Sequence, residues 1–274
     1  MAFDGIFVSG IKSELEKNLL GGRVYKGTEP ERDEIILTIK NNSSTYKLSI
    51  SVNPSLSLCM LTDVNKKSPI NAPTFVMLLR KHIQNGKIVS ITQPNVDRVI
   101  DMEIEHMNEL GDMVSVHLCS EFMGKYSNII LCDNEYNILD SIKRVPSTVS
   151  SVREVLPGRK YFIPDGDKLS LDTLNKNELF ESIRDKKCIL QKAIYTSITG
   201  LSPVIANEIC NNAGLPADLP ATSMSSTEIE KLYNALMNLK SRIDNDEFTF
   251  AIYKDSYSNK PEFSAIPLTS GYYD

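Results

Sequence analysis

Two short segments place charged or amide side chains next to an apolar run, and these residue types are suited to ligand binding. The first ends in Asp97-Arg98, directly before an apolar run that starts at Val99. The second contains the polar residues Glu121, Lys125, Ser127 and Asn128. Side chains at strand ends are positioned by a rigid sheet and are often used for binding. Taken alone, each segment is better explained as a solvated strand end with a surface Asp–Arg pair.

A third candidate lies between two predicted helices, at residues 198–203. Gly200 suits a sharp turn with positive φ, Ser202 is a typical N-cap, and Pro203 suits the first helical position. Apolar–Gly–apolar between helices is typical of a helix-hairpin-helix, which holds a nucleic-acid backbone without reading bases. The start of the following helix would attract anions. The candidate phosphate-binding residues are Gly200, Leu201 and Ser202, with Lys187 and Lys192 from the basic run 184–192. A plain packing corner is the alternative.

Composition limits the class of protein. The 274 residues are 41% hydrophobic and 24% charged, which is typical of a soluble globular protein of about two domains. No apolar stretch is long enough to span a bilayer, and the N-terminus does not resemble a signal peptide, so we expect a cytoplasmic location. The net charge of −5 argues against indiscriminate nucleic-acid binding but allows local basic sites, such as those in 143–160 and 184–192.

Cysteines, histidines and nucleotide motifs give no sign of catalysis. The five cysteines have scattered spacings without Cys-x-x-Cys, and the three histidines form no ligand pattern. Gly-x-Ser-x-Gly and Walker sequences do not occur. We therefore expect reduced thiols, no metal, no cofactor and no enzyme activity.

Apolar periodicity predicts an α+β fold, with a β-rich domain before a helical one. Helices are expected over 5–20, with Asp4 as N-cap, and over 74–84, with Thr74 as cap. A hairpin is expected from strands 34–40 and 46–51, and Ser225 with Glu228 forms a capping box. Further strands are predicted at 56–60, 87–92, 97–106, 113–121, 128–133, 136–142, 248–253 and 261–267. The strands suggest a curled or sandwiched antiparallel sheet.

The ordered motifs resemble the N-terminal half of the NFACT family, the fibronectin-binding-protein-like ribosome quality-control factors. The resemblance rests on Asp4-Gly5, residues 77–82, Asp97-Arg98, residues 121–130, residues 156–161 and residues 200–203. It implies a 1–172 NFACT-N domain similar in fold to the N-terminal domain of formamidopyrimidine-type DNA glycosylases. It also implies a 173–244 helix-hairpin-helix domain and a 245–274 β extension toward a coiled coil that this sequence lacks.

The resemblance implies a non-enzymatic RNA-binding factor. Its expected partners are alanyl-tRNA and the obstructed large ribosomal subunit with peptidyl-tRNA, and its role is to recruit alanyl-tRNA for alanine tailing of stalled chains. No membrane or small-molecule partner is expected. The residues expected to contact tRNA are Asp4, Asp97, Arg98, Glu121, Lys125, Ser127 and Asn128. The alternative is a surface adhesin that binds fibronectin, although the missing signal peptide counts against it.

Several positions depart from the family pattern. Lys125 stands where arginine is usual, which keeps the charge but loses the planar, bidentate fork. Tyr126 stands where histidine is usual, and Asn95 replaces a glycine before Val96, which could alter the turn that leads into Asp97-Arg98. Ala2 and Phe3 replace the proline and glutamate that the glycosylases use, so glycosylase activity is not expected.

Overall fold

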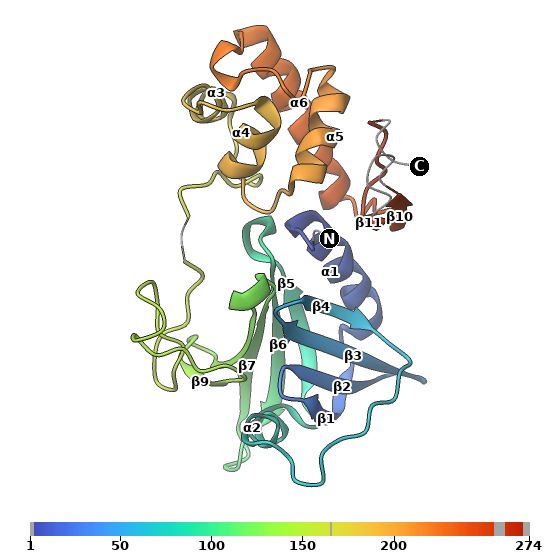
Figure 1. Ribbon diagram of the computed structural model, residues 1–274. Helices are drawn as coiled ribbons and strands as arrows, with labels where there is room; N and C mark the ends of the chain where they lie inside the picture. The colour runs from blue at the N-terminus through green and yellow to red at the C-terminus, as the bar shows by residue number, and fades with distance from the viewer. Residues whose placement is uncertain (1–2, 165, 255–260, 271–274) are drawn as a thin grey trace. The chain divides into compact units, whose positions relative to one another are not determined.

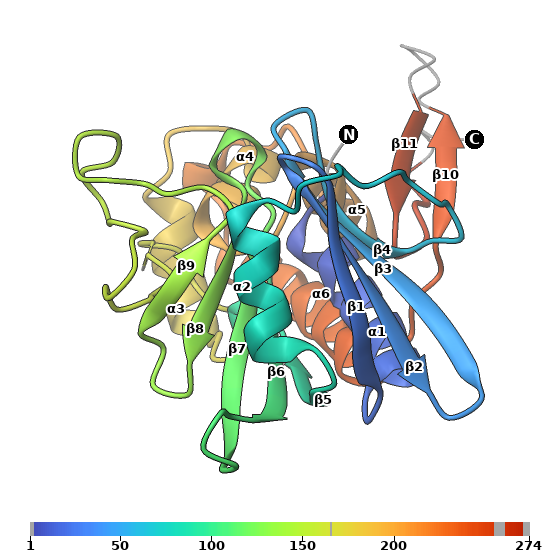
Figure 2. The same cartoon turned by 90° about the horizontal axis from the view of Figure 1, so that it is seen from below.

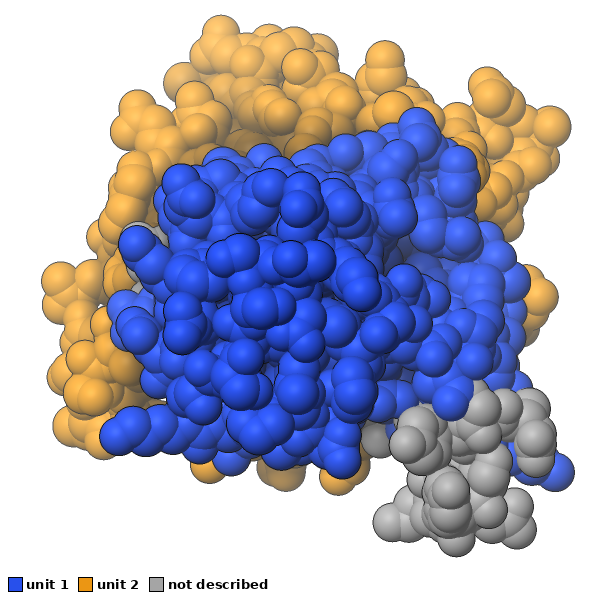
Figure 3. Space-filling view, turned by 90° about the horizontal axis from the view of Figure 1, so that it is seen from above, with its two compact units in different colours: residues 1–10, 95–98, 166–274 blue, residues 11–94, 99–165 orange. Residues whose placement is uncertain are grey.

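The computed structural model describes residues 3–164, 166–254 and 261–270 and shows an α+β protein (Figure 1). The chain divides into two compact units (Figure 3). Unit 1 consists of residues 1–10, 95–98 and 166–274, and unit 2 of residues 11–94 and 99–165. The helix α1 (Gly5–Leu19) contributes residues to both units. The domain ranges expected from the sequence stay a prediction. The compact units differ from them, because residues 1–10 and 95–98 group with the C-terminal part of the chain.

Unit 2 is built on one antiparallel sheet. Within the described residues, its strand order is β4-β3-β2-β1-β5-β6-β7-β8-β9. Only Arg23 and Lys87 pair across β1 and β5, so the sheet consists of two halves joined at a narrow point. The strands are β1 (Arg23–Glu31), β2 (Glu34–Asn41), β3 (Ser44–Asn53), β4 (Leu56–Leu61), β5 (Lys87–Thr92), β6 (Val99–Met107), β7 (Met113–Glu121), β8 (Asn128–Asp133) and β9 (Ile138–Ser141).

The core of unit 2 follows from the alternation of apolar residues. On β2, Ile35, Leu37 and Ile39 are fully buried. Burial of each such side chain stabilises the fold by about 1.5–3 kcal/mol. The helix α2 (Thr74–Ile83) buries Phe75 and Leu79 and packs against β1 and β6 (Figure 2).

Most elements of unit 2 lie where the sequence predicts them, and two details were wrong. The strand β1 was not predicted, because Gly27, Pro30 and register shifts at both ends obscure its alternation. Thr74 does not cap α2, since Pro73 occupies the N-cap position without a side-chain hydrogen bond. The predicted hairpin is confirmed, with Asn42 at the turn in a left-handed conformation (φ 53°).

Unit 1 contains a helical bundle with its own apolar core. Leu179, Ile194, Ile205 and Leu236, one from each helix, are buried in this core. Ser225 and Glu228 form the predicted capping box of the last helix. The helices are α3 (Lys176–Arg184), α4 (Leu190–Ser197), α5 (Pro203–Ala213) and α6 (Ser226–Asp244).

The C-terminal part of unit 1 forms a short β-hairpin. The strands β10 (Ala251–Lys254) and β11 (Pro261–Ser264) pair as antiparallel neighbours, as predicted. After β11, the backbone N–H of Thr269 donates to Glu208 of α5 at 2.8 Å. In the part of the chain that the structure describes, no helix combines the length and the apolar character needed to cross a membrane.

Candidate functional site

Asp4 and Ser202, which lie at opposite ends of the sequence, meet inside unit 1. Asp4 caps α1 as predicted, because its Oδ1 accepts from the backbone N–H of Phe7 at 2.9 Å. Its Oδ2 accepts from the hydroxyl of Ser202 at 2.6 Å. Ser202 in turn caps α5 by accepting from the N–H of Ile205 at 3.3 Å. One carboxylate therefore ties the starts of two helices together.

Burial gives Asp4 an unusual protonation behaviour. The residue is only 8% exposed. Loss of hydration raises the pKa of Asp4 to about 6, although the Ser202 hydroxyl, two backbone N–H groups and the charge of Arg98 act in the opposite direction. The cationic group of Arg98 therefore lies near enough to influence this carboxylate.

Three backbone segments pack without side chains between them at this corner. The N–H of Gly5 donates to the carbonyl of Gly200 at 2.8 Å. A Cβ added at Gly5 would lie 1.9 Å from the carbonyl oxygen of Val96, and one added at Gly200 would lie 2.0 Å from the same oxygen. Gly200 also has the positive φ (81°) that its sequence context predicts. Both glycines are thus required for this close approach.

The turn before Asp97-Arg98 has a strained backbone. Asn95 and Val96 both have a φ of 55°. Asn95 tolerates this left-handed conformation, as the glycine that it replaces would. A β-branched residue such as Val96 rarely adopts it, at a typical cost of about 1–3 kcal/mol. Val96 is buried in the helical core, which holds the strained turn in place and fixes the direction of the following pair.

The strained turn is followed directly by the cationic side chain of Arg98. Asp97 accepts from the backbone N–H of Arg98 at 2.7 Å. Among the described residues, the guanidinium of Arg98 has no hydrogen bond or ion pair. A partly buried guanidinium with free N–H donors binds phosphate or carboxylate ligands strongly, because their oxygens accept charge-assisted hydrogen bonds.

Lys168 lies beside the same corner and was missed by the sequence analysis. Its ammonium donates to the carbonyl of Tyr195 at 3.0 Å. Leu169 forms a parallel bridge with Ile198, which brings this segment alongside the corner. Partial desolvation, followed by the charges of Arg98 and Lys186, lowers the pKa of Lys168. No sequence pattern pointed to Lys168, because the pairing of Leu169 with Ile198 joins distant parts of the chain.

The two predicted lysines of the basic run have different places in unit 1. Gln191, next to Lys192, donates to the carbonyl of Pro203 at 2.9 Å, so the first turn of α4 lies beside the start of α5. Lys192 is exposed there, and Lys187 is exposed in the connection between α3 and α4. The corner therefore combines the cations of Arg98 and Lys168 with the N-terminus of α5, and Lys192 is exposed on the adjoining first turn of α4.

The start of α5 is less open to an anion than the sequence predicts. Pro203 has no N–H, and Ser202 already occupies the N–H of Ile205. The Asp4 carboxylate is also hydrogen-bonded to Ser202. An approaching phosphate would thus be attracted mainly by the nearby cations rather than by free N–H groups.

In unit 2, the predicted site residue Glu121 has internal partners. It is fully buried, and Arg153 Nη2 donates to both of its carboxylate oxygens, at 2.6 Å and 2.5 Å. The hydroxyl of Tyr161 donates to Oε1 at 3.0 Å. A buried charge needs such partners to offset its desolvation. Glu121 therefore holds the inside of this segment together.

Some of the residues after Glu121 are buried and others are exposed. Ser127 Oγ accepts from the N–H of Met123 at 2.8 Å, and Asn128 Nδ2 donates to the carbonyl of Lys143 at 2.8 Å. Ser127 and Asn128 are both buried, whereas Lys125 and Tyr126 are exposed. Of the predicted tRNA-contact residues in this segment, Lys125 is the one whose exposure permits direct contact with RNA. The tRNA contacts expected for Glu121, Ser127 and Asn128 stay predictions. Asp4, Asp97, Arg98 and the corner belong to unit 1 and these residues to unit 2.

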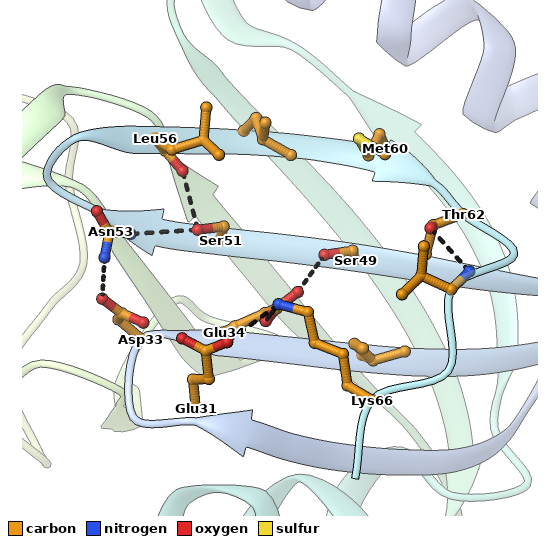
Figure 4. A pocket seen from close by; sticks show the side chains of 13 residues that line it. Glu31, Asp33, Glu34, Ser49, Ser51, Asn53, Leu56, Met60, Thr62 and Lys66 are labelled. Atoms are coloured by element: carbon orange, nitrogen blue, oxygen red, sulfur yellow. Dashed lines mark hydrogen bonds and ion pairs between the residues drawn. The ribbon is translucent and has the colours of Figure 1, made fainter. Parts of the chain in front are cut away.

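A hollow on the sheet of unit 2 has the wrong charge for phosphate. It measures about 450 Å³ and lies over β2, β3 and β4 (Figure 4). Glu31 and Glu34 line it, and the ammonium of Lys66 forms ion pairs with their carboxylates at 3.1 Å and 2.5 Å. These hydrogen bonds raise the pKa of Lys66. In the described residues, no three His, Cys, Asp or Glu side chains are grouped as metal ligands.

Comparison with known sequences relates the whole chain to one family. The family described as NFACT N-terminal and middle domains matches residues 4–274. The Rqc2 homolog RqcH of Bacillus subtilis is 36% identical over 217 residues, which cover 78% of this chain and 38% of that protein. The archaeal Rqc2 homolog aRqcH of Methanocaldococcus jannaschii is 29% identical over 260 residues, which cover 92% of this chain and 36% of that protein. The chain spans less than two fifths of these relatives.

Solved structures agree with the sequence comparison. The fibrinogen binding protein from Staphylococcus aureus has a TM-score of 0.80 at 28% identity, covering 98% of this chain and 91% of that chain. The N-terminal part of the fibronectin/fibrinogen-binding protein from Streptococcus suis has a TM-score of 0.78 at 29% identity, covering 98% of this chain and 92% of that chain.

Proposed function

The chain belongs to the NFACT family, and on that premise we propose that it is the RNA-binding part of a ribosome quality-control factor. Relatives named as ribosome quality-control proteins support this role. We propose further that it binds tRNA, and that in the longer protein it recruits alanyl-tRNA to the obstructed large subunit for alanine tailing of the stalled chain. The proposal includes no catalytic step by this chain.

The observation that carries the tRNA proposal is the state of Arg98. Its guanidinium follows a strained turn and has no hydrogen-bonded partner among the described residues. Maintaining strain and an unpaired cation lowers stability, and such features are typical of binding sites. A charge-assisted hydrogen bond from Arg98 to a backbone phosphate would satisfy its donors. The proposal also has the Asp97 carboxylate accept from a ribose hydroxyl, a group that distinguishes RNA from DNA.

Filter binding of labelled tRNA to the Arg98→Ala and Asp97→Ala variants tests this proposal. We expect Arg98→Ala to weaken tRNA binding about tenfold, the effect of losing one charge-assisted hydrogen bond. The melting temperature should change little, because among the described residues the guanidinium of Arg98 forms no hydrogen bond or ion pair that the substitution would remove. Lys231→Ala removes an exposed cation from α6 and serves as the control for net charge.

Two results would contradict the tRNA role of Arg98. One is an equal loss of affinity in Arg98→Ala and Lys231→Ala, which would mean that only total charge matters. The other is a lower melting temperature in Arg98→Ala or Asp97→Ala with tRNA binding retained, which would mean that the pair serves the fold.

A second candidate function, a fibronectin-binding adhesin, is favoured by the descriptions of the structural relatives as fibronectin- or fibrinogen-binding proteins. Capture of the chain on immobilised fibronectin, with and without excess tRNA, separates the two. Specific capture that tRNA does not displace, together with no tRNA binding in solution, would favour the adhesin. Localisation of the protein by cell fractionation provides an independent check.

A further inference from the structure

A second hollow in unit 2 has the opposite charge to the one over β2, β3 and β4. It lies between β1 and the end of α2 and measures about 480 Å³. It is lined by Tyr25, Lys26, Arg80, Gln84 and Asn85. The lining thus combines two cations, a phenol ring and two carboxamides, and contains no carboxylate. This is the set of groups that proteins use to bind a nucleic-acid strand.

A β-bulge explains why two adjacent side chains of β1 face this hollow. The pairing of β1 with β2 shifts register between Val24 and Lys26. Val24 is buried at 1%, and both Tyr25 and Lys26 are exposed, whereas a regular strand would alternate them. Bulges re-aim side chains and are common next to binding sites. The sequence conceals this feature, because the bulge breaks the pattern that identifies a strand.

Arg80 is held in a fixed position with its outer donors available. Its Nε donates to the carbonyl of Gly27 at 2.9 Å, which fixes the plane of the guanidinium. Among the described residues, neither Arg80 nor Lys26 forms an ion pair with a carboxylate. Arg23 adds a third cation at the rim, because its Nη1 donates to the carbonyl of Asn85 at 2.9 Å.

Tyr25 supplies an aromatic surface between cations. The residue is 52% exposed, and the ammonium of Lys40 lies 3.7 Å from the centre of its ring. Stacking of a base on such a ring contributes about 1–3 kcal/mol and does not depend on base identity. Lys40 holds the ring in place through a cation–π contact and adds positive charge.

The dipole of α2 disfavours an anion at this hollow, and its effective charge can be compared with the charges of the nearby cations. The C-terminus of α2 carries the equivalent of about half a negative charge. The cations nearby are Lys26 and Arg80 in the lining, Arg23 bonded to the carbonyl of Asn85, and Lys40 against the ring of Tyr25. Basic residues in the last turn of a helix commonly complement the dipole, which would explain Arg80 alone. It does not explain the cations and the exposed ring that β1 and β2 contribute.

We propose that this hollow binds a single-stranded nucleic acid, with a backbone phosphate between Lys26 and Arg80 and a base stacked on Tyr25. The carboxamides of Gln84 and Asn85 can hydrogen-bond the sugar or the base edges. The site lies in unit 2, so it does not depend on the tRNA contact proposed for Arg98 in unit 1. It also gives a role to Arg80 of the segment 77–82, which the corner does not use.

Fluorescence anisotropy with labelled hexauridylate, a strand too short to fold as tRNA, tests the proposal on the whole chain. We expect Lys26→Ala and Tyr25→Ala each to weaken binding about tenfold. Lys81→Ala is the matched control, because Lys81 neighbours Arg80 on α2 but pairs with Glu109 and does not line the hollow. The control should bind hexauridylate like the unchanged chain. Amide resonances of Gln84 and Asn85 should shift when hexauridylate is added.

Competition identifies the chemistry of the ligand. Hexathymidylate should displace hexauridylate, whereas inorganic phosphate and polyglutamate should do so only at far higher concentrations. Equal effects of Lys26→Ala and Lys81→Ala, or an absence of binding by the unchanged chain, would overturn the proposal. So would efficient displacement by phosphate, which would indicate a simple anion pocket, or by polyglutamate, which would indicate a site for acidic polypeptides. A failure here would leave the effect of Arg98→Ala on tRNA binding unaffected.

Discussion

Asp4 shows how one buried carboxylate can serve two helices at an energetic cost. Its oxygens accept from the N–H of Phe7 and from the hydroxyl of Ser202, and both hydrogen bonds favour the ionised carboxylate. Desolvation is the largest influence on it and favours the neutral acid. The charge of Arg98 favours the carboxylate. Asp4 is therefore an internal part of the corner, and its tRNA contact stays a prediction.

Replacement of Asp4 by Asn should change how stability depends on pH. Folding raises the pKa of Asp4 from 3.8 to about 6, so the folded chain binds this proton more tightly than the unfolded chain. The resulting stabilisation is complete below pH 4 and is lost as the pH rises through 6. Relative to Asp4→Asn, the unchanged chain should lose about 2 to 3 kcal/mol of unfolding free energy between pH 4 and pH 7, at about 1.4 kcal/mol per pKa unit. Urea unfolding at several pH values measures this difference.

Asp140→Asn provides the control for the pH experiment. Despite desolvation, hydrogen bonds from Arg144 and from the N–H of Ser141 lower the pKa of Asp140. This carboxyl is therefore ionised in both folded and unfolded chains above about pH 5, and its contribution should be constant from there to pH 7. If the difference in unfolding free energy between the unchanged chain and Asp4→Asn is also constant over this pH range, the raised pKa of Asp4 is contradicted.

At the scale of elements, the corner between α4 and α5 depends on close backbone packing as well as on turn geometry. Gly158 and Gly200 both have a φ of 81°. A Cβ at Gly158 would meet nothing within 4 Å, whereas one at Gly200 would lie 2.0 Å from the carbonyl oxygen of Val96. The two glycines therefore separate the cost of the conformation from the cost of the contact.

Gly200→Ala should destabilise the protein more than Gly158→Ala. The left-handed conformation alone costs a non-glycine residue about 1–2 kcal/mol, which is the expected effect at Gly158. Overpacking against Val96 should add about 1–3 kcal/mol at Gly200. Unfolding free energies of both variants in urea measure the difference. Equal losses would mean that the backbone around Val96 moves without cost.

Sequence patterns located most elements, and they failed where a strand departs from regular geometry. The hairpin of β2 and β3, the capping box of α6 and the caps of α1 and α5 were predicted correctly, because each depends on a local period or a residue spacing. The strand β1 was missed, since its bulge at Tyr25 removes the alternation. The same bulge creates the hollow beside α2.

At the scale of the whole molecule, a net charge of −5 coexists with separate regions of opposite sign. The hollow over β2, β3 and β4 is lined by carboxylates, whereas Arg98 and Lys168 stand together in unit 1. Overall charge therefore disfavours long-range attraction to RNA, and local cations determine where a phosphate can bind. Because only a few phosphate contacts are expected, the affinity for tRNA should fall moderately as the salt concentration rises.

Lys168→Ala should reduce the salt dependence of tRNA binding. Each phosphate contact contributes about −0.7 to −0.9 to the slope of log K against log salt concentration. Loss of Lys168 should make the slope about one unit shallower, whereas Lys231→Ala should leave it unchanged. Filter binding across a range of salt concentrations gives both slopes. An unchanged slope for Lys168→Ala would remove this lysine from the interface.

Sequence alone was enough to establish the α+β class, the family, the caps of α1, α5 and α6 and the left-handed turn at Gly200, because these depend on residues close together in the chain or on ordered motifs. Only the tertiary structure joined Asp4 to Ser202, placed Lys168 beside the corner and enclosed Glu121 with Arg153. Such contacts link positions separated by up to 198 residues. The free energy of burying and pairing those groups depends on the whole fold, and no local pattern in the sequence encodes it.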